Sequence, residues 1–280
     1  MSAPYLMPII ALGIVAVVVV VGIFVAGSSN NASSAALPAM PKTGQPVPES
    51  MAGITSGTPQ QASATLSQLA QAGAANFSQF KASYSGSISI VPSGILGAIA
   101  SVNSPLYLNE YGTGASERMD INASSMPVVG RALVTYLNTT RNTYVCDNLN
   151  ASAMSQGKVL DILTGSRELT CSSNDTLLAP RLRGLYNLNL SMLSQFGIAI
   201  SYDQVYQSEY NGSPCTYVHG MLSGLNGSGE LGMCILDSNY IPATIAARFS
   251  NSNAHLFLVL NETYIGNGTA FPGSLPGPLT

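Results

Sequence analysis

Two cysteines, Cys215 and Cys234, stand on either side of a glycine-rich turn, and this arrangement constrains the fold of the chain most strongly. Around both cysteines, apolar and polar side chains alternate, which is typical of β-strands with one buried face. If the two cysteines face each other across a hairpin, the loop falls at residues 223–226. The stretch therefore predicts a disulfide-bonded β-ribbon.

This register assigns the side chains of the ribbon to two faces, because neighbouring residues of a strand point in opposite directions. It sets His219 opposite Glu230, an attractive pair of charges across the strands. It also sets Tyr217 over Gly232, where an aromatic ring covers a glycine gap. The other face carries the aliphatic side chains that we expect to line a ligand site: Val218, Leu222, Leu231, Met233 and Ile235.

The remaining cysteines, Cys146 and Cys171, bring the total to four, all after residue 145. An even number of cysteines fits an oxidising compartment. Three pairings are formally open, and the hairpin geometry favours Cys146 with Cys171 and Cys215 with Cys234. Neither a CxxC motif nor zinc-type Cys/His spacing occurs, so we expect no metal site.

An uncharged apolar run at residues 8–26 is the clearest feature of the N-terminus. As a helix it would span about 28 Å, close to the hydrocarbon thickness of a bilayer. The run predicts a transmembrane signal anchor at residues 1–27, with a cleaved signal peptide as the alternative. We therefore expect a single-pass protein of the cell membrane, attached through residues 8–26, with its C-terminal domain extracytoplasmic.

The rest of the chain divides by composition. Residues 28–61 are rich in Ser, Pro and Gly and predict a flexible linker. Residues 62–266 form the extracytoplasmic domain, and residues 267–280 a disordered tail. Helical periodicity occurs within the domain at residues 62–80, and residues 158–167 and 188–196 are further predicted helices.

Period-two alternation follows the first of these helical segments and predicts strands in most of the domain. The fold class expected is α+β: an antiparallel, half-barrel-like sheet with helices packed on one face. The run at residues 255–260 is apolar on both faces, so we expect at least one strand to be covered on both sides. The strand-like runs are residues 84–90, 106–108, 132–137, 143–147, 215–222, 231–237, 243–250 and 255–260.

The motif N-x-[ST] occurs at eleven of the twenty asparagines, which indicates glycosylation outside the cell. An alternative is that turns favour Asn, Ser and Thr together. Asn211 is a poor acceptor because a proline follows its motif. The expected glycan acceptors are Asn76, Asn122, Asn138, Asn150, Asn174, Asn189, Asn226 and Asn261.

Charged residues make up only 8% of the chain, against 46% hydrophobic ones, and the net charge is −3. No basic patch is available for a phosphate backbone, so nucleic acid is not an expected partner. The low charge also suggests an acidic exterior, and an archaeal envelope protein would be consistent with it. No motif for a cofactor is present.

Catalytic residues are not expected. Both histidines, His219 and His255, lie in predicted strands, where structural or surface roles are common. The chain contains no G-x-S-x-G elbow, HExxH motif or glycine-rich phosphate loop. We expect a protein that is not an enzyme, with an unrecognised hydrolase as the alternative.

A set of residues in the last third of the chain occurs in a characteristic order: Tyr210, Gly212, Cys215, Val218, Gly220, Cys234, Asp237 and Pro242. This order resembles that of the LolA/LolB-like lipoprotein-carrier superfamily. That resemblance implies an unclosed antiparallel half-barrel with an apolar concavity for an acyl chain. The function expected is a membrane-tethered module that binds lipid or another hydrophobic ligand. The alternative is a glycosylated structural or adhesive protein of the cell envelope.

Overall fold

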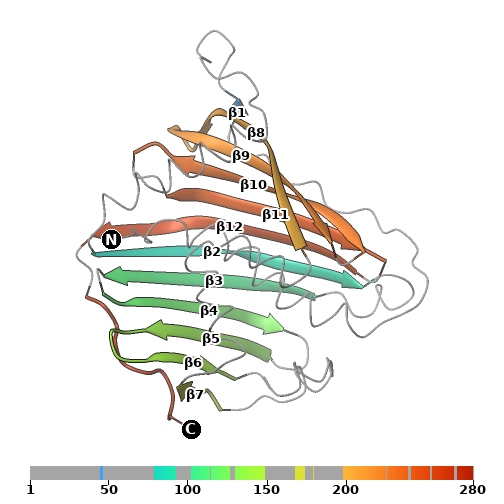
Figure 1. The fold of residues 1–280 in the computed structure, drawn as a ribbon. Helices are drawn as coiled ribbons and strands as arrows, with labels where there is room; N and C mark the ends of the chain where they lie inside the picture. The colour runs from blue at the N-terminus through green and yellow to red at the C-terminus, as the bar shows by residue number, and fades with distance from the viewer. Residues whose placement is uncertain are drawn as a thin grey trace.

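A single antiparallel sheet of twelve strands dominates the computed structural model (Figure 1). Its order is β1-β8-β9-β10-β11-β12-β2-β3-β4-β5-β6-β7. The structure describes residues 45–46, 79–92, 102–113, 115–126, 130–148, 168–173, 179, 198–224, 226–238, 241–252, 254–267 and 270–279.

The strands vary from two to fourteen residues in length. Those before residue 180 are β1 (Gln45–Pro46), β2 (Gln79–Pro92), β3 (Val102–Thr113), β4 (Glu117–Met126), β5 (Gly130–Asn138), β6 (Thr143–Asp147) and β7 (Thr170–Ser173). Those after it are β8 (Ile198–Tyr210), β9 (Ser213–Gly224), β10 (Gly227–Leu236), β11 (Pro242–Asn251) and β12 (Ala254–Asn267).

The predicted α+β class is wrong. The described residues are almost all antiparallel strand, with helical conformation only at Ala179, so none of them forms a helix packed on the sheet. The alternating runs extend further than predicted: β2 and β12 each reach 14 residues. Apart from residues 79–80, which begin β2, the segments predicted as helices at 62–80, 158–167 and 188–196 lie outside the described residues.

The last quarter of the chain forms the predicted antiparallel meander, β9 to β12, and both disulfides have the predicted pairing. The register of the β9–β10 ribbon differs, however. Gly224 pairs with Gly227, so the turn is two residues long and contains Asn226 at a positive φ of 55°. Such turns match the twist of the flanking strands, which favours them over the longer predicted loop.

As a result, Cys234 lies opposite Tyr217 and not opposite Cys215. The two cysteines are diagonal neighbours on one face, with 5.6 Å between their Cα atoms, a separation that a disulfide spans readily. The predicted pair of Tyr217 over Gly232 is therefore wrong, since Gly232 lies opposite His219.

Strand β8 was missed by the sequence reasoning, which placed a helix just before it. It pairs with β9 along its length, from Ile198 to Tyr210, through a turn at Asn211 and Gly212. Both turn residues have positive φ, 49° and 80°. An Asn-Gly pair between alternating runs is a strong hairpin signal, and it marks this turn in the sequence.

The two faces of the sheet differ in chemistry. One face, here called the buried face, carries a nearly continuous apolar surface from β9 across to β6, while the opposite face carries serines, tyrosines and most charged groups. The apolar members of the buried face include Val218, Leu222, Leu231, Met233, Ile245, Phe249, Leu256, Leu258, Leu260, Ile88, Leu106, Leu108, Met119 and Val145.

Strand β12 was predicted to be covered on both faces, but only one of its faces is fully covered. Leu256, Leu258 and Leu260 are buried, whereas Phe257 and Val259 on the opposite face are half-buried.

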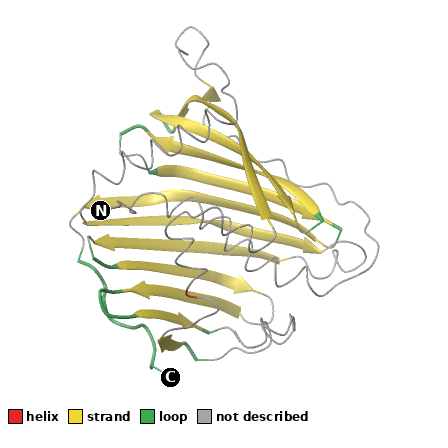
Figure 2. Cartoon of the chain, viewed as in Figure 1, coloured by secondary structure: helices red, strands yellow, loops and turns green. Residues whose placement is uncertain are grey.

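Residues 270–279, which belong to the segment 267–280 predicted as a disordered tail, run close to β4 and reach the free edge of β7 (Figure 2). The guanidinium of Arg118 donates hydrogen bonds to the carbonyls of Pro272 and Ser274, at 2.6 and 2.9 Å. Further on, the amide of Cys171 donates to the carbonyl of Pro278 at 2.8 Å, and Leu279 pairs with β7 in parallel. Arg118 is consequently buried, at 8% exposure, whereas the side chain of its partner Asp120 stays 25% exposed.

The predicted single-pass location at a membrane is the second expectation to be corrected. Among the residues that the structure describes, no helix is long and apolar enough to cross a bilayer. Residues 8–26, on which the expectation rested, lie outside the described residues, as does the predicted linker apart from β1.

Removing a disulfide is expected to destabilise the sheet. The bonds join cysteines 25 and 19 residues apart, and the unfolded chain gains entropy when either loop opens. The double variants Cys146→Ala/Cys171→Ala and Cys215→Ala/Cys234→Ala should each lose about 3 kcal/mol of unfolding free energy. Urea unfolding followed by circular dichroism measures this, with Ser173→Ala at an exposed position as control. Unchanged midpoints would contradict the expectation.

Candidate functional site

A buried carboxyl lies in the apolar face of the sheet. Glu110 on β3 is 0% exposed, and its cross-strand neighbours are Ala82 on β2 and Met119 on β4. Neither carboxyl oxygen has a hydrogen-bond partner among the residues that the structure describes. Buried polar groups in proteins are nearly always hydrogen-bonded, so this residue calls for an explanation.

Tyr84 adds a second polar group beside it. It lies opposite Leu108, two residues before Glu110 on the same strand, and so is a diagonal neighbour within reach of that carboxyl. Its ring is 1% exposed, and its hydroxyl also lacks a partner. On its other side, Tyr84 pairs with Glu262 of β12, next to a bulge.

Burial raises the pKa values of Glu110, Tyr84 and Glu262. Burial raises the pKa of Glu110 from 4.5 to about 8, because an apolar environment disfavours the ionised form. Burial, and then the charges of Glu110 and Glu262, raise the pKa of Tyr84 well above 10. Burial also raises the pKa of Glu262. At neutral pH the Glu110 carboxyl is therefore mostly protonated, able both to donate and to accept a hydrogen bond.

A second unpartnered hydroxyl lies at the other end of the sheet. Tyr202 on β8 packs over Gly220 of β9, where an added Cβ would approach its ring at 3.1 Å. Its hydroxyl is buried without a partner, and burial raises its pKa. Tyr202 faces the same side of the sheet as Tyr84 but lies five strands away.

The five residues predicted to line a ligand site all lie on the buried face, with exposures of 2% or less. The shift in register left them there because it amounts to two residues, which preserves the face of every side chain. Val218 lies opposite Met233, for example. Ligand binding by Val218, Leu222, Leu231, Met233 and Ile235 stays a prediction.

The opposite face holds a row of charges across β8 to β11. The Nδ1 atom of His219 lies 2.6 Å from the carboxylate of Asp203, and its Nε2 atom lies 3.4 Å from Glu230. Glu230 in turn contacts Arg248. The predicted attraction between His219 and Glu230 is therefore present, although as a diagonal pair. Asp203 joins the row because it occupies a bulge in β8.

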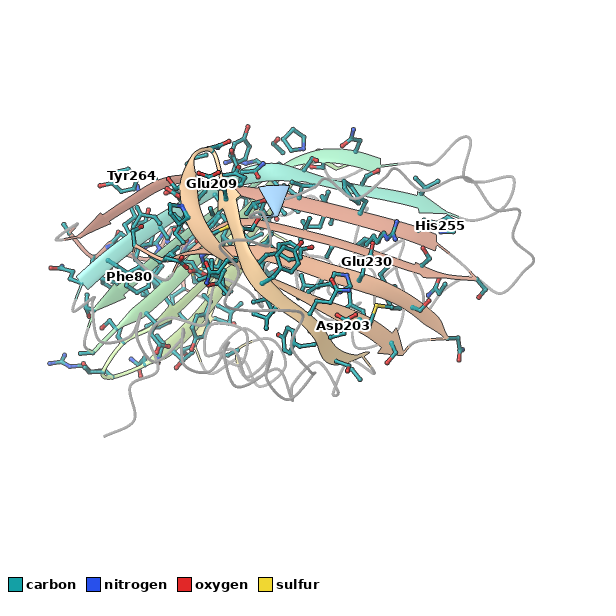
Figure 3. The ribbon with its side chains drawn as sticks, turned by 90° about the horizontal axis from the view of Figure 1, so that it is seen from above. Phe80, Asp203, Glu209, Glu230, His255 and Tyr264 are labelled. Carbon is teal, nitrogen blue, oxygen red and sulfur yellow. A yellow bond between two sulfur atoms is a disulfide. The ribbon has the colours of Figure 1, made fainter. Side chains whose placement is uncertain are left out.

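Figure 3 shows Asp203 and Glu230 near each other, with Phe80 and Tyr264 toward the opposite end of the strands. Within the described part of the chain, His219 hydrogen-bonds to a carboxylate and to no hydroxyl or thiol. The row thus links His219 to two carboxylates and Glu230 to Arg248, and in the described residues it brings no hydroxyl or thiol to His219. That the protein is not an enzyme stays a prediction.

No group of three or more His, Cys, Asp or Glu side chains in the described ranges is placed to hold a metal ion. His255 contributes to no such group, and its two ring nitrogens are buried without hydrogen bonds.

The predicted glycan acceptors fall in different settings. Asn226 is exposed in the β9–β10 turn. Asn122 and Asn261 accept hydrogen bonds from Arg131 and Tyr210, respectively. Asn138 donates its amide to Glu117. The other four acceptors, Asn76, Asn150, Asn174 and Asn189, lie outside the described residues, and glycosylation at all eight stays a prediction.

Sequence reasoning did not single out Glu110, although a signal for it was present. Leu106 and Leu108 were assigned to one face of a strand, and Glu110 continues their period of two. Glutamate side chains are rarely buried, so the alternation alone does not lead one to expect Glu110 on the buried face. Tyr84 was recognised as part of the alternation but not as a polar group on the buried face.

No protein-family model matches the sequence, and neither does any curated protein. Among solved structures, a DUF1329 family protein from Desulfovibrio piger aligns with 76% of this chain and 93% of its own, at 9% identity and a TM-score of 0.31. PNGF-II aligns with 71% of this chain and 31% of its own, at 9% identity and a TM-score of 0.31.

MucB in complex with MucA(peri) aligns with 75% of this chain and all of its own, at 8% identity and a TM-score of 0.14. TM-scores this low do not establish a shared fold, so none of these proteins informs the function of this one. The resemblance to the lipoprotein-carrier superfamily therefore stays a prediction.

The raised pKa of Glu110 makes stability depend on pH. Between about pH 4.5 and pH 8 the folded protein keeps a proton that the unfolded chain releases, so the free energy of unfolding falls as pH rises. Glu110→Gln should flatten this slope and exceed the wild type by a few kcal/mol above pH 8. A shallower slope remains from Glu262, whose pKa shifts in the same direction.

Urea unfolding at pH 5, 7 and 9 measures the effect. Glu168→Gln, which neutralises an exposed carboxylate, is the matched control and should leave the slope unchanged. If Glu110→Gln and wild type fall in parallel, Glu110 is not protonated in the folded state.

Proposed function

We propose that this protein is a binding module that holds a lipid or another hydrophobic molecule against the buried face of its sheet. The observation that carries the proposal is the set of enclosed, unpartnered polar atoms at one place on that face: both oxygens of Glu110 and the hydroxyl of Tyr84. An unpaired buried polar group costs about 1–3 kcal/mol. A surface that served only as a structural core would gain by replacing these groups with apolar ones.

The composition of the face supports the same proposal. Sites for small hydrophobic molecules are lined mainly by apolar side chains and contain a few placed polar groups. Here, aliphatic residues from β9 through β6 lie on the same face as the Glu110 carboxyl and the Tyr84 hydroxyl. A bound amphiphile would cover the apolar side chains and provide hydrogen-bond partners for the polar ones.

The proposal predicts that lipid accompanies the purified protein. Mass spectrometry of organic extracts from gently purified full-length chain should detect a hydrophobic molecule in a defined ratio to protein. The extracted protein should then take up a fluorescent acyl probe. A chain that yields no bound lipid and takes up no probe would refute the proposed function.

A pair of variants on one strand locates the site. Val218→Phe adds bulk on the buried face and should weaken probe binding at least threefold, because the ring occupies space that the ligand uses. Met221→Phe adds a ring on the opposite face, where Met221 is 45% exposed, and should leave binding unchanged. Urea unfolding of both variants verifies that they are folded.

A further inference from the structure

The polar groups that the described strands place on the buried face are acidic or neutral. Around Tyr84 the register gathers Glu110 on β3 and Glu262 on β12, and Glu117 on β4 lies diagonally beyond Glu110. Glu117 accepts a hydrogen bond from Asn138, at 3.3 Å. The two oxygens of Glu110 and the hydroxyl of Tyr84 remain unpartnered.

Basic side chains of the described strands all point to the opposite face. Lys81 lies 5.5 and 5.4 Å from the ring centres of Tyr111 and Tyr264 on that side. Arg118 is held there by Asp120 and the C-terminal residues. Arg131 and Arg248 also lie on that face, bonded to Asn122 and Glu230. No described strand therefore supplies a cation to the surroundings of Glu110.

We propose that the hydrophobic ligand carries an uncharged hydroxyl head group, of the glycerol or alcohol type, held by Glu110 and Tyr84. This inference rests on the proposed function, and it adds the class of head group and the residues that read it. It makes Glu110 and Tyr84 the specificity-determining pair of the site.

Hydrogen-bond chemistry favours a hydroxyl over charged alternatives. A hydroxyl donates to the carbonyl oxygen of a protonated carboxyl and accepts from its O–H or from a phenol, so one group satisfies atoms on both residues. A phosphate or carboxylate would face carboxyls in an apolar setting with no described cation, which costs several kcal/mol. An ammonium would require Glu110 to ionise in that setting, and burial opposes this.

The position of Tyr84 supports a shared role with Glu110. The two are diagonal neighbours on adjacent strands, both are 1% exposed or less, and both lack partners. Tyr202 has the same unpartnered phenol on the same face but lies five strands from β2, roughly 24 Å away at ordinary strand spacing. It serves as a matched control because a head group at Glu110 does not reach it.

The test is competition for a fluorescent acyl probe on the lipid-extracted full-length protein at pH 7. The competitors share one chain and differ in head group: monooleoylglycerol, oleate, oleyl phosphate and oleylamine. We expect monooleoylglycerol to displace the probe at a concentration about tenfold below that of the charged competitors. Equal or stronger displacement by any charged competitor overturns the inference.

Single-residue variants then test whether Glu110 and Tyr84 bind the head group. Tyr84→Phe should raise the monooleoylglycerol concentration needed by about threefold to tenfold, and Tyr202→Phe should leave it unchanged. Glu110→Leu should have the same effect as Tyr84→Phe, whereas Glu110→Gln, which keeps a donor and an acceptor, should retain binding. An unaffected Tyr84→Phe, or a loss confined to Tyr202→Phe, overturns the assignment.

The outcomes separate this inference from the proposed function. If the wild type binds no acyl probe, the proposed function fails. If it binds the probe but does not prefer monooleoylglycerol, the proposed function stands and the head-group inference fails. Unfolding curves for every variant show whether lost binding reflects lost folding, and the conservative Tyr84→Phe keeps the test open if Glu110→Leu does not fold.

Discussion

Alternation of side chains across one continuous antiparallel sheet is the constraint on which the rest of this structure depends. Each strand sends successive side chains to opposite faces, and each ladder passes that assignment to the next strand. Across the ladders from β9 to β6, this produces one apolar face and one polar face. A slip of one residue in any ladder would turn a strand over and place its apolar side chains among the serines of the opposite face.

Different contacts stabilise the two edges of the sheet. On the β7 side, the disulfide between Cys146 and Cys171 joins the last two strands, and Leu279 pairs beside Cys171. On the β1 side, Gln45 and Pro46 pair with the end of β8 only. Between them, the second disulfide ties β9 to β10 diagonally. The C-terminal residues thus take part in the fold. Their carbonyls accept hydrogen bonds from Arg118, whose other partner is the carboxylate of Asp120.

Glu110 is the residue at which stability and the proposed function conflict. An apolar side chain between Ala82 and Met119 would continue the buried face without cost, whereas a carboxyl there is held in its neutral form and lacks partners. Sites that violate the local rules of a fold are where function is expected. A ligand with a hydroxyl would relieve the unpaired atoms of Glu110 and Tyr84 together, and the apolar surroundings would accommodate its chain.

The sequence alone determined the period-two strands of the last quarter, the pairing of the cysteines and the side of the ribbon on which Val218 and Met233 lie. These are local properties, set by alternation and by a short separation along the chain. Only the tertiary structure decided the hairpin register, the position of Cys234 opposite Tyr217, and the approach of Asp203 to His219 through a bulge. It also corrected the α+β class, and it brought Tyr84 beside Glu110, because pairing between strands distant in sequence fixes which side chains meet across a sheet.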